Sequence, residues 1–159
     1  RHAVTAQPDR EAIEFEGRWI TYGEIGGIAN RVAELIRGAS PDSRAPVAFA
    51  PRNHPSAIAA LIGLVAEMRT IRMMYVYQSG EALARNVERI KASVMVAAQA
   101  DFSPDLIAYL RTKGIAAIML TPSGVEFVPG LEKASRPTDP DAPVAAPRSP
   151  SMRTVYSVA

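Results

Sequence analysis

Histidine and cysteine, which are frequent in catalytic and metal-binding sites, are nearly absent from this sequence. The 159 residues include two histidines, His2 and His54, and no cysteine. Two histidines without a defined carboxylate partner do not make a metal site, and the lack of cysteine excludes disulfides and a cysteine nucleophile. Beside Pro55, His54 is predicted to be a loop or helix-cap residue and not a catalytic base. We therefore predict no catalytic residue and no metal ligand in the chain.

Glu14 and Glu16 are the nearest approach to a paired-carboxylate site. They alternate with Ile13 and Phe15, so both are predicted to project from one side of a strand. Two carboxylates can act as general acid and base, but a solvated strand face explains this alternation better. The sequence also lacks a Gly-x-Gly-x-x-Gly after a strand and a Gly-x-Ser-x-Gly, which disfavours dinucleotide binding and the common hydrolase chemistry.

Composition limits the class of protein. Hydrophobic residues make up 48% and charged residues 21%, as in an ordinary soluble globular protein. The net charge is only +2, and Lys and Arg are scattered, so we predict no nucleic-acid partner. The longest apolar run, 57–66, is too short to span a bilayer, and no signal peptide is visible. These features predict a cytoplasmic protein without a membrane span.

Residues 12–38 predict a hairpin that leads directly into an amphipathic helix. Glu16-Gly17 supplies the turn of the hairpin, and Trp19 is predicted to be its hydrophobic anchor. Thr21 is a predicted helix N-cap, with Glu24 at the spacing of a capping box. Apolar residues then recur at helical intervals on one face: Ile25, Ile28, Ala29, Val32, Leu35 and Ile36.

The next ninety or so residues predict an α/β fold. Short apolar strands near residues 47, 72, 95 and 117 are separated by helices, which predicts a series of βαβ units. The helix over 56–68 is apolar on nearly every side, so we expect it to be buried between layers, with Gly63 marking a close contact. The predicted class is a Rossmann-like α/β fold, with a mostly parallel sheet, helices on both faces and an N-terminal β-hairpin.

Three segments follow from this pattern. Residues 1–128 are predicted to form the α/β subdomain, with a short last strand at 125–128. Residues 129–150 are rich in proline and predict an extended connector. Residues 151–159 predict the start of another strand, at which the chain stops.

The hairpin and first helix resemble the opening of the adenylate-forming enzymes. These include acyl-CoA synthetases, aryl-CoA ligases and nonribosomal peptide adenylation domains. Their pattern is Phe-x-Gly-x-x-hydrophobic-Thr-Tyr-x-Glu-hydrophobic, followed by a helix with Ala-Asn-Arg-hydrophobic-Ala. The matching residues are Phe15, Gly17, Ile20, Thr21, Tyr22, Glu24, Ile25, Ala29, Asn30, Arg31, Val32 and Ala33.

Two further segments carry the resemblance with departures. Arg52-Asn53 is similar to the family's Pro-Asn-Ser, whereas 67–69 replaces its Lys-Ala-Gly. The fatty-acid, aryl and amino-acid branches therefore all remain open. At the C-terminal end, 155–157 resembles the strand that leads into the family's Ser-Gly-Thr-Thr-Gly-x-Pro-Lys loop, which holds the ATP phosphates. The resemblance implies that Ser157 borders that loop, while Val158 and Ala159 depart from it; an ordinary strand residue is the alternative for Ser157.

The resemblance covers almost the whole chain as the first third or so of such an enzyme. It implies the N-terminal subdomain of an ATP-dependent carboxylate–CoA ligase, truncated before the phosphate loop, whose parent uses a carboxylic acid, ATP, Mg²⁺ and CoA. The fragment alone is expected to be inactive and to bind none of these cofactors. Surface exposed by truncation is expected to make it form a homodimer or aggregate. The alternatives are a non-enzymatic α/β interaction module and, ranked last, another kind of nucleotide-binding Rossmann protein.

Overall fold

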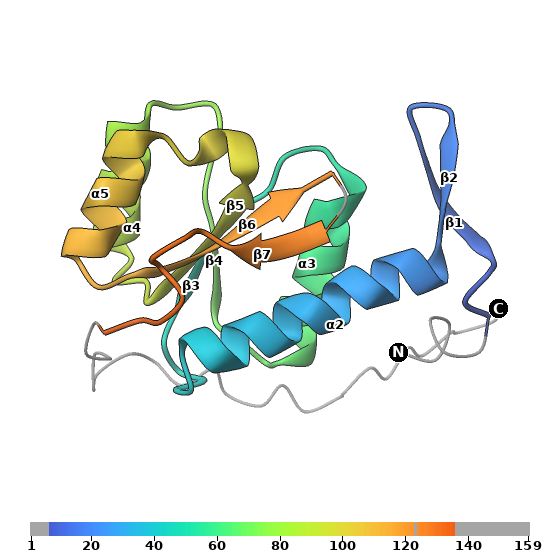
Figure 1. Ribbon diagram of the computed structural model, residues 1–159, viewed down its shortest axis with the longest axis horizontal. Coiled ribbons are helices and arrows are strands. Elements are labelled where there is room, and N and C mark those ends of the chain that lie inside the picture. Colours follow the sequence, from blue (N-terminus) through green and yellow to red (C-terminus); the bar gives the residue numbers. More distant parts are fainter. Residues whose placement is uncertain (1–6, 123, 136–159) are drawn as a thin grey trace, which may run out of the picture.

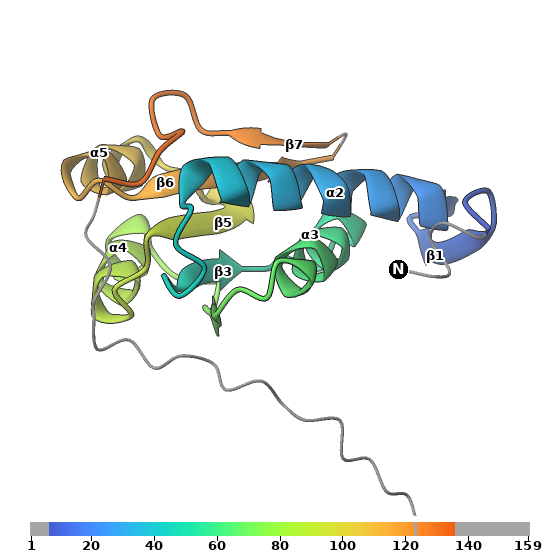
Figure 2. The same cartoon turned by 90° about the horizontal axis from the view of Figure 1, so that it is seen from below.

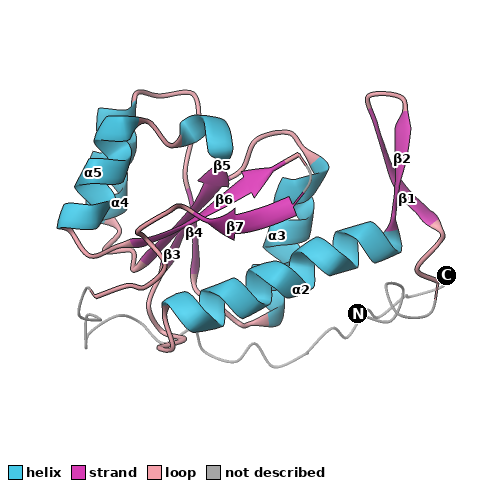
Figure 3. Cartoon of the chain, in the orientation of Figure 1, coloured by secondary structure: helices cyan, strands magenta, loops and turns pink. Residues whose placement is uncertain are grey.

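The computed structural model describes residues 7–122 and 124–135. Its elements, shown in Figures 1 and 3, are β1 (Glu11–Phe15), β2 (Arg18–Thr21), α2 (Tyr22–Ala39), β3 (Val47–Ala50), α3 (Pro55–Ala66), β4 (Ile71–Met73), α4 (Gly80–Arg89), β5 (Val94–Ala98), the 3₁₀ turn η1 (Gln99–Asp101), α5 (Pro104–Thr112), β6 (Ala116–Thr121) and β7 (Gly124–Phe127).

A mixed sheet with the strand order β4-β3-β5-β6-β7 lies at the centre of the described residues. The strands from β4 to β6 are parallel to their neighbours, and β7 is antiparallel to β6. The predicted strands near 47, 72, 95 and 117 are thus confirmed, as is the α/β class with a mostly parallel sheet. The strand predicted at 125–128 is β7.

Side chains alternate between the two faces of the sheet and form a separate core on each. One core holds α4 and α5 against small strand residues, chiefly Ala48, Ala50, Ala97 and Ala117, together with Met95. The other holds α2 and α3 against larger strand residues: Val47, Phe49, Val94, Val96, Ile118 and Leu120. Figure 2 shows the strands between these two pairs of helices, as the pattern of apolar runs predicted.

The N-terminal hairpin stands at one end of α2, away from α4 and α5 (Figure 1). Its two-residue turn is made by Glu16 and Gly17, both with positive φ, 52° and 77°. Glu16 therefore lies in the turn and not in the strand beside Glu14, so the two carboxylates do not form a pair on one strand face. Trp19 is 50% exposed, which contradicts its predicted role as anchor; Ile20, which faces the opposite side of the strand, is buried instead.

The capping box at the start of α2 is confirmed. The backbone N–H of Glu24 donates to Oγ1 of Thr21 at 3.2 Å, and the backbone N–H of Thr21 donates to Oε2 of Glu24 at 2.8 Å. These reciprocal bonds satisfy two backbone donors that a helix start otherwise leaves without partners. The box fixes the direction in which α2 leaves the hairpin.

Helix α3 is buried on one side only, contrary to the prediction. Towards α2 it presents Gly63, where an added Cβ would overlap the carbonyl oxygen of Ala29, so the predicted close contact is confirmed. Its opposite side is apolar and exposed, and consists of Ile58, Leu61, Ile62 and Val65. We call these four residues the outer face of α3. No element of the described residues covers this face, because the sheet and α2 lie on the other side of the helix.

The described part of the predicted connector, 129–135, lies against the α/β body. Leu131 is buried, and its carbonyl accepts a hydrogen bond from the backbone N–H of Ala117 at 2.9 Å. The N–H of Ala134 donates to the carbonyl of Ala39 at the end of α2, also at 2.9 Å. The rest of the predicted connector and the predicted strand at 151–159, including Ser157, lie outside the described residues.

Candidate functional site

The strand order creates a switch point between β3 and β5. The chain leaves β3 towards α3 on one face of the sheet, and it leaves β5 through η1 towards α5 on the other face. Loops that diverge in this way open a crevice outside the carboxyl ends of two neighbouring parallel strands. In open α/β sheets, this is the usual location of a ligand.

An ion pair spans the crevice between the two loops. Arg52, which follows β3, binds Asp101, which ends η1. Nε of Arg52 lies 3.0 and 3.1 Å from the two carboxylate oxygens, and Nη2 lies 2.5 Å from Oδ1. The carboxylate is 2% exposed and the arginine side chain 37% exposed. The pKa of Arg52 is raised by its hydrogen bonds to Asp101 and by the charge of that carboxylate.

Tyr77, in the loop after β4, contacts the same arginine. The guanidinium carbon of Arg52 lies 5.6 Å from the centre of the Tyr77 ring, within the range of a cation–π contact. Asp101 and Tyr77 together hold the orientation of the Arg52 side chain.

His54 caps α3, as predicted. The backbone N–H of Ser56 donates to Nδ1 of His54 at 3.1 Å, so Nδ1 is the unprotonated nitrogen of the ring. The hydroxyl of Ser56 lies 2.8 Å from Nδ1 and therefore donates to it as well. The edge-on contact with Phe15, with ring centres 4.9 Å apart, ties the cap to the hairpin. Ser56 is only 4% exposed, and both its backbone N–H and its hydroxyl contact Nδ1, so this serine–histidine contact serves the cap.

Two cavities adjoin the start of α3. The first, the switch-point crevice, has a volume of about 270 Å³ and is lined by Arg52, His54, Ser56, Ala57, Ala98, Gln99, Ala100, Leu120, Thr121 and Pro122. The second, the hairpin groove, has a volume of about 670 Å³ and lies between the hairpin, α2 and the start of α3. Arg18 and Glu24 form an ion pair of 3.0 Å on its wall. The pKa of Glu24 is lowered, chiefly by the hydrogen bond from the backbone N–H of Thr21.

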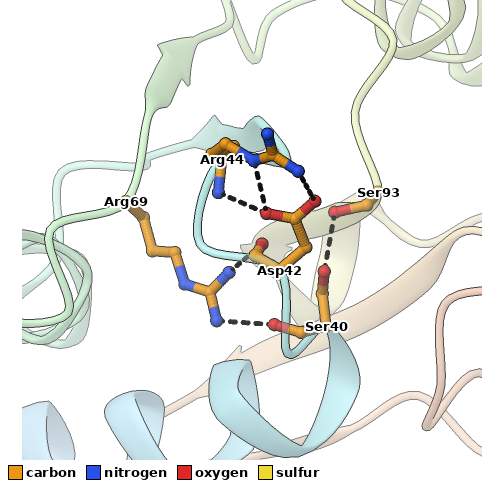
Figure 4. A network of polar contacts seen from close by, with 5 residues as sticks. All are labelled: Ser40, Asp42, Arg44, Arg69 and Ser93. Atoms are coloured by element: carbon orange, nitrogen blue, oxygen red, sulfur yellow. Dashed lines mark hydrogen bonds and ion pairs between the residues drawn. The ribbon is translucent and has the colours of Figure 1, made fainter. Parts of the chain in front are cut away.

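A polar cluster around Arg69 has a structural role (Figure 4). The guanidinium donates to the carbonyls of Ser40 and Asp42, both at 2.6 Å, and to that of Ile36 at 3.3 Å. Arg69 is 8% exposed, and burial lowers its pKa. A cation at the C-terminal end of a helix satisfies carbonyls that have no partner within the helix. Arg69 thus joins the loop before β4 to the end of α2.

Within 7–122 and 124–135, no three His, Asp or Glu side chains gather where they could hold a metal ion. In the same ranges, no helix has the length and apolar character needed to cross a membrane. His2 and Ser157 lie outside these ranges.

Sequence reasoning did not find the Arg52–Asp101 pair. The two residues are 49 positions apart, and the resemblance of Arg52-Asn53 to the family's Pro-Asn-Ser does not point to Asp101. The available signal was positional: each residue follows an apolar strand, and the carboxyl ends of parallel strands meet at one edge of the sheet.

Comparison with known proteins shows the lineage. The family profile described as AMP-binding enzyme matches residues 1–156. The medium/long-chain-fatty-acid–CoA ligase FadD6 of Mycobacterium tuberculosis is 28% identical over 141 residues, which are 84% of this chain and 22% of that protein. The nonribosomal peptide synthetase atnA of Emericella nidulans is 26% identical over 133 residues, which are 82% of this chain and 2% of that protein.

The fold agrees with this lineage. The crystal structure of IdnL1 matches with a TM-score of 0.67 at 18% identity, over 91% of this chain and 29% of that one. The chain spans about a fifth of the length of FadD6 and a far smaller part of atnA. The resemblance that residues 12–38 predicted is confirmed, and the chain belongs to the AMP-binding enzyme family of adenylate-forming enzymes.

Proposed function

We propose that this chain is the N-terminal part of an ATP-dependent carboxylate–CoA ligase. The complete enzyme would join a carboxylic acid to the α-phosphate of ATP, forming an acyl adenylate and releasing pyrophosphate. The thiol of CoA would then attack the acyl carbon and release AMP. The observation that supports this most is the family match over 1–156, together with the fatty-acid–CoA ligase among the relatives. We also propose that the enzyme acts in the cytoplasm, where ATP and CoA are available.

In this proposal the described residues serve as scaffold. The two-faced sheet and the capped helices α2 and α3 would support the start of the ATP site, with Ser157 at the border of the phosphate loop. The described part of the chain offers no group of carboxylates or histidines fitted to Mg²⁺.

The proposal predicts that residues 1–159 alone do not catalyse adenylation. The test is exchange of labelled pyrophosphate into ATP, with a panel of fatty, aryl and amino acids. We expect no exchange above a blank without protein. Robust exchange by this chain would contradict its role as scaffold.

The ligase activity itself is tested on the complete gene product. Hydroxylamine traps an acyl adenylate as a hydroxamate, and mass spectrometry detects an acyl-CoA when CoA is added. Hydroxamate and acyl-CoA together would support the carboxylate–CoA ligase. Hydroxamate without acyl-CoA would favour a peptide-synthetase type of adenylation, and neither product would contradict both.

The outer face of α3 favours a second candidate function, association with another protein chain. It presents four large apolar side chains to solvent on one helix, and such surfaces usually mark interfaces. We propose that a second copy covers it, giving a homodimer of this chain. Sedimentation at high concentration should show a dimer, and Ile62→Lys should restore the monomer. The matched control is Trp19→Lys, at a similarly exposed apolar residue on the hairpin, and it should leave the dimer unchanged. A wild-type chain that sediments as a monomer would refute the proposal.

A further inference from the structure

We propose that His54 is a pH-sensitive latch, which holds the first turn of α3 while its ring is neutral and releases that turn when the ring gains a proton. The inference goes beyond the proposed ligase activity, because it concerns how the fold responds to pH and requires no ligand. It rests on three observations: what Nδ1 of His54 accepts, which charges surround the ring, and what the cap holds in place.

Nδ1 of His54 is the acceptor on which the cap of α3 depends. It accepts a hydrogen bond from the backbone N–H of Ser56 at 3.1 Å, and it lies 2.8 Å from the hydroxyl of the same residue. Only a neutral ring has an unprotonated nitrogen, since both nitrogens of an imidazolium are donors. A protonated His54 therefore has no acceptor in any rotamer, and the N–H of Ser56 loses its partner. Because Ser56 is 4% exposed, water has little access to that N–H.

The helix itself also opposes a positive charge at this position. His54 is the N-cap of α3, a helix of 12 residues, and the N–H groups at a helix start carry a partial positive charge. An acidic residue in the first turn would offset an imidazolium there, but the first turn of α3 contains none. Protonation of His54 thus removes the hydrogen bonds of the cap and places a like charge at the positive end of the helix dipole.

The charged groups around the ring do not favour an imidazolium either. The charged side chains that line the two cavities beside His54, or pair with one that does, are Arg18, Glu24, Arg31, Arg52 and Asp101. Both carboxylates already pair with an arginine, Glu24 with Arg18 and Asp101 with Arg52. The β6–β7 loop contributes only uncharged residues to the described linings. The excess charge around His54 is therefore positive.

The cap holds a wall that the two cavities share. His54 and Ser56 line both the hairpin groove and the switch-point crevice. The His54 ring also packs edge-on against Phe15, so one side chain joins the hairpin to the start of α3. Release of the cap would change the shape of both cavities together. Histidine changes its charge between pH 5 and 8, so the latch would respond within that range.

The test is amide hydrogen exchange of the isotope-labelled chain, residues 1–159, measured by NMR at pH 8 and at pH 5. Each rate is divided by that of an unfolded peptide at the same pH, which gives a protection factor free of the intrinsic effect of pH. We expect 56–58 to lose protection about fivefold at pH 5, as for a lost N-cap, while β5 and β6 keep theirs. Glu24 does not contribute at pH 5, because its pKa is lowered from 4.5. At pH 8, the ring nitrogen signals of His54 should show an unprotonated Nδ1.

Matched variants separate His54 from other groups that titrate. His54→Asn keeps an acceptor at the N-cap that does not titrate, so 56–58 should stay protected at pH 5. His2→Asn makes the same change at the other histidine and should lose protection as the wild type does. If His54→Asn fails to fold, the wild-type protection factors and ring signals decide alone. Unchanged wild-type protection at pH 5, a loss that extends equally to β5 and β6, an equal loss in His54→Asn, or a protonated Nδ1 at pH 8 would each overturn the assignment.

Discussion

Replacing Arg69 with methionine should destabilise the fold without touching either cavity. Methionine keeps much of the aliphatic stem of the side chain but removes every donor of the guanidinium. The carbonyls of Ser40 and Asp42 then lose hydrogen bonds of 2.6 Å, and that of Ile36 loses a weaker one of 3.3 Å. The loop before β4 is no longer joined to the end of α2.

The hydrogen bonds of Arg69 determine how much stability the substitution removes. A hydrogen bond from a charged donor contributes about 1.5–3 kcal/mol, so the two short bonds together contribute roughly 3–6 kcal/mol. Against this, Nε of Arg69 is buried without a partner among the described residues, and a buried unsatisfied group costs about 1–3 kcal/mol. Subtracting the cost of the unsatisfied Nε from the gain of the two short bonds leaves a net contribution of about 3 kcal/mol. We therefore expect the free energy of unfolding of Arg69→Met to be about 3 kcal/mol lower than that of the wild type. For a chain of this length, that corresponds to a melting temperature lower by about 9 °C, at roughly 3 °C per kcal/mol.

The measurement is urea and thermal unfolding followed by circular dichroism. Arg31→Met is the control, because it removes an arginine from α2, the helix whose end Arg69 caps, and the ion pair of Arg31 with Glu34 is solvent-exposed on both sides. Exposed pairs contribute about 0–1 kcal/mol, so this control should melt close to the wild type. If Arg69→Met were no less stable than Arg31→Met, water would satisfy the helix end equally well, and the role assigned to Arg69 would be wrong.

Three further predictions concern backbone and helix ends, and all use the same unfolding measurements. Gly63→Ala should destabilise the fold by about 2–3 kcal/mol, because the added Cβ would overlap the Ala29 carbonyl. Gly27→Ala, in α2, should instead stabilise the fold by about 0.5–1 kcal/mol, because an added Cβ there meets open space. Met68→Gly should stabilise by about 1 kcal/mol, since Met68 has a φ of 52° just after α3; no gain would refute strain there. The pKa of Glu24 is lowered below its ordinary value of 4.5, so its ionised form stabilises the fold above that pH, and the contribution is lost as pH falls through the folded-state pKa. Glu24→Gln should flatten this part of the stability–pH curve, and an unchanged slope would contradict the assignment.

Local signals predicted local structure well. Thr21 with Glu24 and His54 before Pro55 were each expected at a helix start, and each is an N-cap. These predictions succeed because a cap depends on residues at most three positions apart. The turn at Glu16-Gly17 succeeded for the same reason.

Predictions that needed the surroundings of a side chain were less successful. The composition of α3 shows that its sides are apolar, but burial depends on whether another element covers each side, and none of the described elements covers the outer face. Trp19 and Ile20 are adjacent and both apolar. Which of them is buried depends on which side of the hairpin packs on α2 and α3.

The candidate site was the feature that the sequence predicted least. Arg52 and Asp101 meet because β5 lies next to β3, although β4 follows β3 in the chain. The series of apolar runs predicts the strands but leaves their order open. A contact between loops that follow two different strands appears only once that order is known.

The difference between the two faces of the sheet has a consequence for how this sequence can change. Strand residues facing α4 and α5 are mostly alanines, so those helices pack close to the backbone of the sheet and leave no space for a larger side chain. Strand residues facing α2 and α3 are large, and shortening them would open cavities. One face therefore resists enlargement and the other resists truncation. Variation in the core should follow opposite directions at successive positions along the same strand.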